Sequence, residues 1–323
     1  MKCFACFIVV CGAGILFLQA QPNSQPKDVR KPEFTISNPS ANGNAIAFSA
    51  DGLLLAAAFE HAIQIYDVHQ GYPLSAKPNQ TLAGAATHAL TFLDSNILVS
   101  LAADGSVKTW DTTSGKMLHR TSLDSGVFTV SAFATRNQPV LATATRNRVT
   151  LWNYETGKSL DAFDTTDSTV SALAFTPDGK LLVIGTHKGV VRVFDVASGK
   201  ITRTIDLDSP ISALCASTNY IVLGYSDGTL AQLSFGGQTS TPEVNGHNHA
   251  VTAVTFSPQG ERFASGSTDG TIKIWKPESL KLLASLKVSA AAIPVIAFSK
   301  DGRILVSGSA NGTINGWRLV PIQ

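Results

Sequence analysis

The chain has 323 residues, a formal net charge of +2 and 15% charged residues. This length is ample for a buried core, and a charge so near zero creates no field that would attract nucleic acid. Composition therefore excludes a strongly basic nucleic-acid-binding protein and leaves a soluble binding surface as the general expectation.

The N-terminal stretch predicts a signal peptide. Met1-Lys2 is followed by an uncharged apolar run from Cys3 to Leu18, and then by the small residue Ala20. A basic start, a short apolar run and a small residue are typical of secretory signals. We expect residues 1–20 to be this signal and the protein to be exported, whether secreted, periplasmic or in the cell envelope. The alternative is an uncleaved membrane anchor formed by residues 3–18.

Residues 21–32 are rich in Pro, Ser, Asn and Lys and lack periodicity, so they predict a flexible linker. Three of the four cysteines lie in the predicted signal, and only Cys215 remains after cleavage. An exported protein with one cysteine has no internal disulfide. We expect Cys215 to be a small core residue rather than a reactive thiol.

Repeats begin near residue 33 and are clearest between Gly246 and Trp275. Short apolar strands alternate there with turn signals, at residues 257–260 and at Asp269-Gly270. A further strand is expected over Lys281–Val288. Trp275 has a counterpart in every other repeat, at successive spacings of 44, 42, 42, 39, 42 and 42 residues: Tyr66, Trp110, Trp152, Phe194, Leu233 and Trp317. A period near 42 residues predicts propeller blades, here seven.

The residues from Gly246-His247 to Ser265-Gly-Ser-x-Asp269-Gly-Thr-Ile-Lys-Ile-Trp275 resemble the WD40 repeat. The resemblance covers nearly the whole chain after about residue 33. It implies an all-β, seven-bladed WD40-type β-propeller over residues 33–323, with four-stranded blades. After Trp317 no fourth strand remains, so we expect Glu33–Ser37 to be the outer strand of the last blade and to close the ring.

The resemblance also implies a hydrogen-bond network in blade six. His247, Ser265 or Ser267, Asp269 and Trp275 match the residues that the family links in one blade. A buried Asp needs several donors to remain charged, and the imidazole and indole can supply them. We interpret this set as structural and not as a catalytic triad.

By resemblance, the hairpins between the second and third strands lie on one face, around the mouth of the central channel. Six charged residues fall on this face and are the candidates for partner binding: Arg146, Arg148, His187 and Lys188 on blades three and four, and Glu60 and Asp104 on blades one and two. The alternative is that they are ordinary solvated loop charges.

Phe128 is a further partner-binding candidate. It aligns with Ser171 and Thr252, at a position that points to the channel mouth in this family. An exposed aromatic there would be an anchor of the kind enriched in binding hot spots. The alternative is that Phe128 folds back into a core gap beside Ala132 and Ala134.

No catalytic residue, cofactor site or metal site is expected, because His247 and His249 lie on a loop without further ligands at metal spacing. We predict a non-catalytic, exported WD40 scaffold that binds an unidentified protein or peptide at the channel mouth. It should bind no nucleic acid, and a membrane only if residues 1–20 stay attached. Two alternatives remain, a propeller enzyme or ligand-binding propeller using Glu60 or Asp104, and a structural part of an envelope assembly. Asn79 and Asn311 fit the glycosylation pattern.

Overall fold

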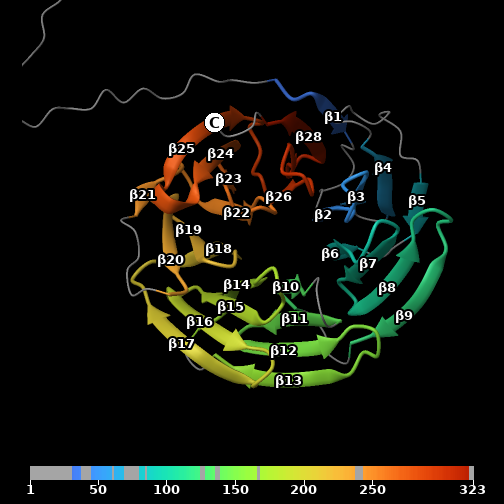
Figure 1. Cartoon of the computed structure of the whole chain (residues 1–323), viewed down its shortest axis with the longest axis horizontal. Helices are drawn as coiled ribbons and strands as arrows, with labels where there is room; N and C mark the ends of the chain where they lie inside the picture. Colours follow the sequence, from blue (N-terminus) through green and yellow to red (C-terminus); the bar gives the residue numbers. More distant parts are fainter. Residues whose placement is uncertain are drawn as a thin grey trace, which may run out of the picture.

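The computed structural model describes residues 31–37, 45–59, 62–68, 80–83, 86–123, 128–134, 139–165, 168–236 and 243–319. These residues form seven four-stranded antiparallel sheets, arranged as blades around a central axis (Figure 1). The predicted signal, residues 21–30, Glu60 and Asn79 lie outside the described residues. In the described part of the chain, no helix has the length and apolar character needed to cross a membrane.

Each blade runs from an inner strand to an outer one. Blade one consists of β2 (Ala45–Phe48), β3 (Leu54–Phe59), β4 (Ala62–Asp67) and β5 (Gln80–Ala83). Blade two consists of β6 (Thr87–Phe92), β7 (Ile97–Ala102), β8 (Ser106–Asp111) and β9 (Met117–Ser122). Blade three consists of β10 (Val130–Phe133), β11 (Val140–Thr145), β12 (Arg148–Asn153) and β13 (Ser159–Asp164).

Blade four consists of β14 (Val170–Phe175), β15 (Leu181–Thr186), β16 (Val190–Asp195) and β17 (Lys200–Asp206). Blade five consists of β18 (Ile211–Ala216), β19 (Tyr220–Tyr225), β20 (Thr229–Ser234) and β21 (Val244–Asn245). Blade six consists of β22 (Val251–Phe256), β23 (Phe263–Ser267), β24 (Thr271–Lys276) and β25 (Lys281–Lys287), with a 3₁₀ turn at Pro277–Ser279. Blade seven is β26 (Val295–Phe298), β27 (Ile304–Gly308), β28 (Thr313–Arg318) and β1 (Phe34–Ser37).

The residues that set the repeat period occupy one structural position. In each blade the Trp275 counterpart lies on the third strand, opposite a buried Leu, Ile or Phe of the second: Trp275 pairs with Phe263, and the divergent Leu233 pairs with Ile221. The repeat period therefore reflects the pairing register of the second and third strands, because each repeat must place a large apolar side chain at the same depth in its blade. The prediction of seven WD40-type blades is confirmed.

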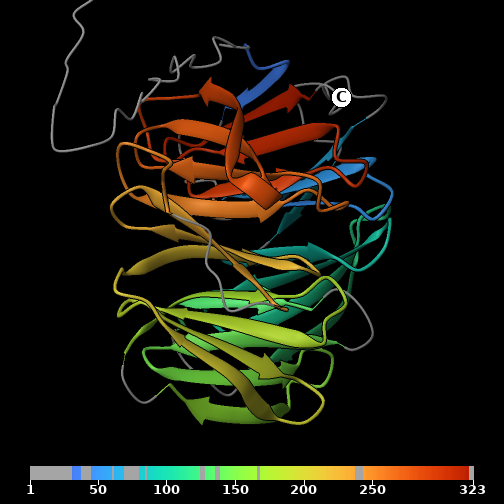
Figure 2. The same ribbon diagram turned by 60° about the vertical axis from the view of Figure 1, so that its left-hand side comes forward.

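The closing strand is also confirmed. β1 pairs antiparallel with β28, from Phe34 opposite Gly316 to Ser37 opposite Thr313. Figures 1 and 2 both show this N-terminal strand beside the C-terminal blade. Ile36 is 5% exposed, and a Cβ on Gly316 would lie 2.1 Å from the Phe34 ring. The absence of a side chain at residue 316 therefore allows Phe34 to lie against β28.

The apolar core lies between the blades. Val183 and Val193 of blade four, for example, pack in one cluster with Ile211 and Leu214 of blade five. Cys215 is buried in the next cluster, where burial raises the pKa of its thiol. It is thus the inert core residue that the sequence predicts. Each blade is held by its two neighbours, which makes the ring a rigid frame for its loops.

Candidate functional site: the channel mouth

Strand pairing places the candidate residues on one face. The first residue of each inner strand lies opposite the last residue of the second strand or the one before it, as Val251 lies opposite Ser267 and Val130 opposite Ala144. Residues leading into the inner strands and the hairpins between second and third strands therefore share a face, which we call the mouth face. On this side a cavity of about 350 Å³ is lined by the inner strands of blades two to seven.

Hydroxyl groups recur around this cavity. Thr129, Ser171, Ser212 and Thr252 take equivalent positions, and each donates to a carbonyl of its own second strand at 3.0–3.2 Å. The hydroxyls of Ser212 and Thr252 also lie 2.7 Å from carbonyl oxygens of the following blade, at Val251 and Ile293. Since these hydrogens point to the backbone, the oxygens that border the cavity can only accept further hydrogen bonds.

In blade two the equivalent position is His88, which the sequence analysis missed. Its ring lies edge-on to Phe128, with ring centroids 5.2 Å apart. Burial lowers the pKa of His88 from its ordinary value, so the imidazole is neutral at pH 7. The available signal was positional: Ser171, Ser212 and Thr252 each follow the first apolar residue of an inner strand, and His88 stands at the same point of its repeat.

The prediction of an exposed anchor at Phe128 is wrong. Phe128 is 6% exposed and packs with Leu101, Leu123 and Trp152 in the core between blades two and three. Thr129, not Phe128, matches Ser171 and Thr252, because its hydroxyl makes their hydrogen bond. Phe128 instead corresponds to the buried Val170 and Val251. The sequence alignment of this blade was displaced by one residue, which exchanges a channel-facing side chain for a core one.

Three predicted basic residues are exposed at neighbouring hairpins. Arg146 lies in the hairpin of blade three, and His187 and Lys188 lie in that of blade four. Arg146 has a φ of 54°, which a two-residue hairpin of this kind requires and which most side chains avoid. Its carbonyl accepts a 2.7 Å hydrogen bond from Val170 N, so the backbone of this hairpin is fixed on blade four. The two hairpins form one basic edge of the mouth face.

Other predicted residues serve local structure. Arg148 is paired with Asp164 at 3.2 Å, across β12 and β13. Asp104 accepts hydrogen bonds from Ser106 N and Ser106 Oγ in its own turn, and these bonds lower the pKa of its carboxyl. The described residues contain no group of three His, Cys, Asp or Glu side chains that could hold a metal ion. The alternative of a metal-binding propeller thus has no ligand set in this part of the chain.

Blade six brings its predicted polar residues together. Trp275 Nε1 donates to Ser265 Oγ at 2.8 Å, and Ser265 Oγ lies 2.7 Å from His247 Nε2. On the other side of the ring, His247 Nδ1 lies 2.8 Å from Thr271 Oγ1, which donates to Asp269 Oδ1 at 2.6 Å. Thr271 was missed by the sequence analysis. Ser267 stands outside this chain of bonds, because its hydroxyl donates to His249 O and accepts from Asp269 N.

The order of donors identifies the state of the imidazole. Burial lowers the pKa of His247 to about 4, against the attraction of Asp269, whose carboxylate lies 3.6 Å away. Burial alone would raise the pKa of Asp269, but hydrogen bonds from Thr271 and from Asn248 N hold it below its ordinary value. A neutral imidazole with its proton on Nδ1 accepts from Ser265 and donates to Thr271, which satisfies every group. The arrangement braces a hairpin, and the hydroxyl of Ser265 at its centre is fully buried.

Two family models match the chain. One is described as "WD domain, G-beta repeat" and matches residues 238–276 and 280–318. The other is described as "Anaphase-promoting complex subunit 4 WD40 domain" and matches residues 130–219. Together they cover about half of the chain, including blades four and six.

Curated relatives are distant. Autophagy-related protein 16 of Arabidopsis thaliana is 24% identical over 61% of this chain and 39% of its own length. Periodic tryptophan protein 2 of Arabidopsis thaliana is 25% identical over 72% of this chain and 22% of its own. Eukaryotic translation initiation factor 3 subunit I of Emericella nidulans is 27% identical over 62% of this chain and 66% of its own length. The chain thus spans well under half the length of the two plant relatives.

Proposed function

This chain belongs to the WD40-repeat family, and we propose that it is a non-catalytic scaffold that binds a protein or peptide through its mouth face. The observation that carries this proposal is the convergence of inner strands from six blades on one cavity, beside the exposed basic hairpins of blades three and four. A rigid ring positions such loops in advance and so lowers the entropic cost of binding.

The charges on the mouth face indicate the kind of partner. Arg146 and Lys188 form no ion pair with any described residue, in contrast to Arg148. Exposed charges without a local partner favour association with a surface of opposite sign. We therefore propose that the partner places acidic residues over blades three and four. The name of the initiation-factor relative, a subunit, supports a role in assembly for this family.

We further propose that the protein acts outside the cytoplasm, on the strength of residues 1–20. The experiment is affinity capture from the exported fraction with mass spectrometry, using wild type and an Arg146→Glu, Lys188→Glu variant. The control is Lys158→Glu, Lys200→Glu, which makes the same charge change on the same two blades but on the opposite face.

We expect a partner held by wild type and the control and reduced at least about tenfold on the mouth-face variant. Equal capture by all three proteins would place binding elsewhere, and no partner on any of them would contradict a scaffold role. The mass of the exported protein gives a separate reading, because retention of residues 1–20 would contradict signal cleavage.

A further inference from the structure

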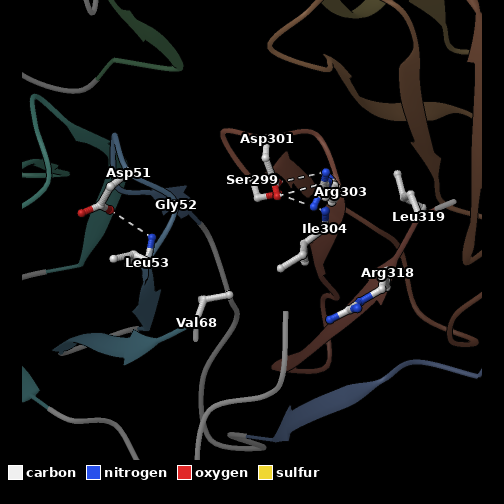
Figure 3. Close-up of a pocket in the computed structure, with 10 residues that line it drawn as sticks. All are labelled: Asp51, Gly52, Leu53, Val68, Ser299, Asp301, Arg303, Ile304, Arg318 and Leu319. Atoms are coloured by element: carbon white, nitrogen blue, oxygen red, sulfur yellow. Dashed lines mark hydrogen bonds and ion pairs between the residues drawn. The ribbon is translucent and has the colours of Figure 1, made fainter. Parts of the chain in front are cut away.

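A second cavity, unrelated to the mouth face, lies at the seam between the first and last blades. It has a volume of about 660 Å³ and lies on the opposite face, between the blade-one turn at residues 51–53 and the blade-seven turn at residues 299–304 (Figure 3). We call it the seam pocket. Its apolar lining includes Leu53 and Val68 from blade one and Ile304 and Leu319 from blade seven.

The seam is more open here than at the neighbouring blades. Between blades one and two, Ala50 N donates to Asp94 O at 3.3 Å, and between blades six and seven Gln259 Nε2 donates to Lys300 O at 3.0 Å. The turns of blades one and seven are both described and share no hydrogen bond. The two turns lie near each other at Gly52, where a Cβ would lie 3.6 Å from Lys300. The pocket opens beside this contact.

The floor of the pocket is the edge of the core that joins the two blades. Val68 and Ile304 belong to one apolar cluster with Leu55 of blade one and Val306 of blade seven. Val68 is 3% exposed and Ile304 is 7% exposed, while Leu53 at the margin is 44% exposed. An apolar group in the pocket would extend this cluster and remove part of the remaining surface from water.

Two guanidinium groups stand on the blade-seven side. Arg303 Nε lies 3.9 Å from Asp301 Oδ2, and Arg318 Nε lies 3.7 Å from Glu33 Oε2. Both distances exceed the roughly 2.8 Å of a charge-assisted hydrogen bond. The other oxygen of Asp301 is engaged in its own turn by Ser299 Oγ and Arg303 N. A carboxylate at hydrogen-bond distance from Arg303 would therefore compete well with the long contact between Arg303 and Asp301, since guanidinium binds carboxylates in a bidentate manner.

We propose that the seam pocket binds a small amphiphilic carboxylate. The apolar tail lies on Val68, Ile304 and Leu319, and the carboxylate binds Arg303 with Arg318 beside it. Because such a ligand contacts the first and last blades at once, it stabilises the closed ring. This site is independent of the mouth face, so neither proposal depends on the other.

The test is the melting temperature of the full protein with octanoate as the probe. Acetate has the charge without the tail, and octanol has the tail without the charge. At an octanoate concentration about ten times its Kd, we expect the melting temperature to rise by about 2 °C. The other two compounds at the same concentration should leave it unchanged. An equal rise with octanol would contradict recognition of the carboxylate, and no rise with octanoate would overturn the proposal.

Variants locate the effect. Arg303→Ala should weaken octanoate binding about tenfold, because a charge-assisted hydrogen bond is lost. Lys180→Ala is the matched control, since Lys180 follows the same Asp-Gly turn in blade four and pairs with Asp178 at 3.9 Å. Intermolecular nuclear Overhauser effects between the octanoate chain and the methyl groups of Val68 and Ile304 give a second readout that needs no variant. Their absence, or an equal loss in both variants, would show that octanoate binds elsewhere.

Discussion

Blades six and seven place the same two side chains at the same positions and use them differently. In blade six, Trp275 Nε1 donates to Ser265 Oγ, and the imidazole of His247 continues the chain of bonds. In blade seven, Trp317 Nε1 and Ser307 Oγ are buried, yet neither has a hydrogen-bond partner among the described residues. Identity of the Ser and Trp therefore does not ensure the bond between them.

The difference follows from the residue that precedes each inner strand. His247 lies before the inner strand of blade six, and its Nε2 lies 2.7 Å from Ser265 Oγ. At the same point of the repeat blade seven has Ser289, and it has Asn311 where blade six has Asp269. Ser289 Oγ accepts hydrogen bonds from Ala291 N at 2.9 Å and from Asn311 Nδ2 at 3.5 Å, so blade seven has no imidazole there to orient the hydroxyl of Ser307. Blade seven is held instead by apolar packing and by β1, whereas blade six has an internal polar brace.

The largest expected effect comes from removing β1, the strand that supports blade seven where blade six has a polar network. Deletion of residues 33–37 removes the four residues of β1, the buried Ile36 and every backbone pair that closes the ring. We expect the melting temperature, measured by circular dichroism, to fall by about 10 °C or more. Deletion of residues 1–32 is the control and should leave it unchanged. A small difference between the two proteins would show that the ring does not depend on this strand.

A second prediction concerns pH and separates blade six from blade seven. His247 titrates at about 4 in the folded protein and near 6.5 when unfolded, so the unfolded state binds more protons between these values. Its contribution to stability is complete above pH 6.5 and is lost as the pH falls toward 4. Asp269 acts in the same direction at lower pH, because its folded pKa is also lowered.

In urea unfolding, the loss of stability caused by His247→Gln should be about 2–3 kcal/mol larger at pH 7.5 than at pH 4.5. His249→Gln is the surface control and should keep the wild-type dependence. An equal loss at both pH values would mean that His247 is not neutral in the folded state.

The smallest expected effect comes from removing one hydroxyl in each blade. Ser265→Ala leaves His247 Nε2 and Trp275 Nε1 without a hydrogen-bond partner in a buried site, so we expect a loss of about 2 kcal/mol. Ser307→Ala removes a buried hydroxyl without a partner, so we expect no loss, or a gain of up to about 1 kcal/mol. Denaturant midpoints of the two variants check this. Equal losses would mean that Ser307 is bonded in solution.

The sequence predicts the architecture well because the repeat period is tied to register. Even Leu233, which lacks the indole of its counterparts, is found opposite Ile221 as its position in the repeat requires. The closing strand was predictable for a related reason, since the last repeat lacks a fourth strand and the residues before the first repeat alternate. Both features depend only on which positions are apolar.

The mouth face was harder to predict because it depends on single-residue register. The inner strands of blades two, four, five and six contain a bulge at their second residue, so strict alternation fails there. In blade three the run Val127-Phe128-Thr129-Val130 offers two apolar phases, and sequence alone left open whether Phe128 faces the channel or the core. The pairing of Arg148 depends likewise on Asp164 of the adjacent strand, and the position of His88 depends on Phe128 of the next blade.

The closing strand also has a consequence for the order in which the ring can be completed. Thr35 donates to the side chain of Asn315 at 2.8 Å, although 280 residues separate them. Ribosomes make β1 first, yet its binding site on β28 exists only when the last blade has been made. The earliest strand must therefore stay unpaired through the whole of synthesis, and closing so long a loop is a slow step. Pairing of β1 with β28 therefore requires that every blade between these two strands has already been made.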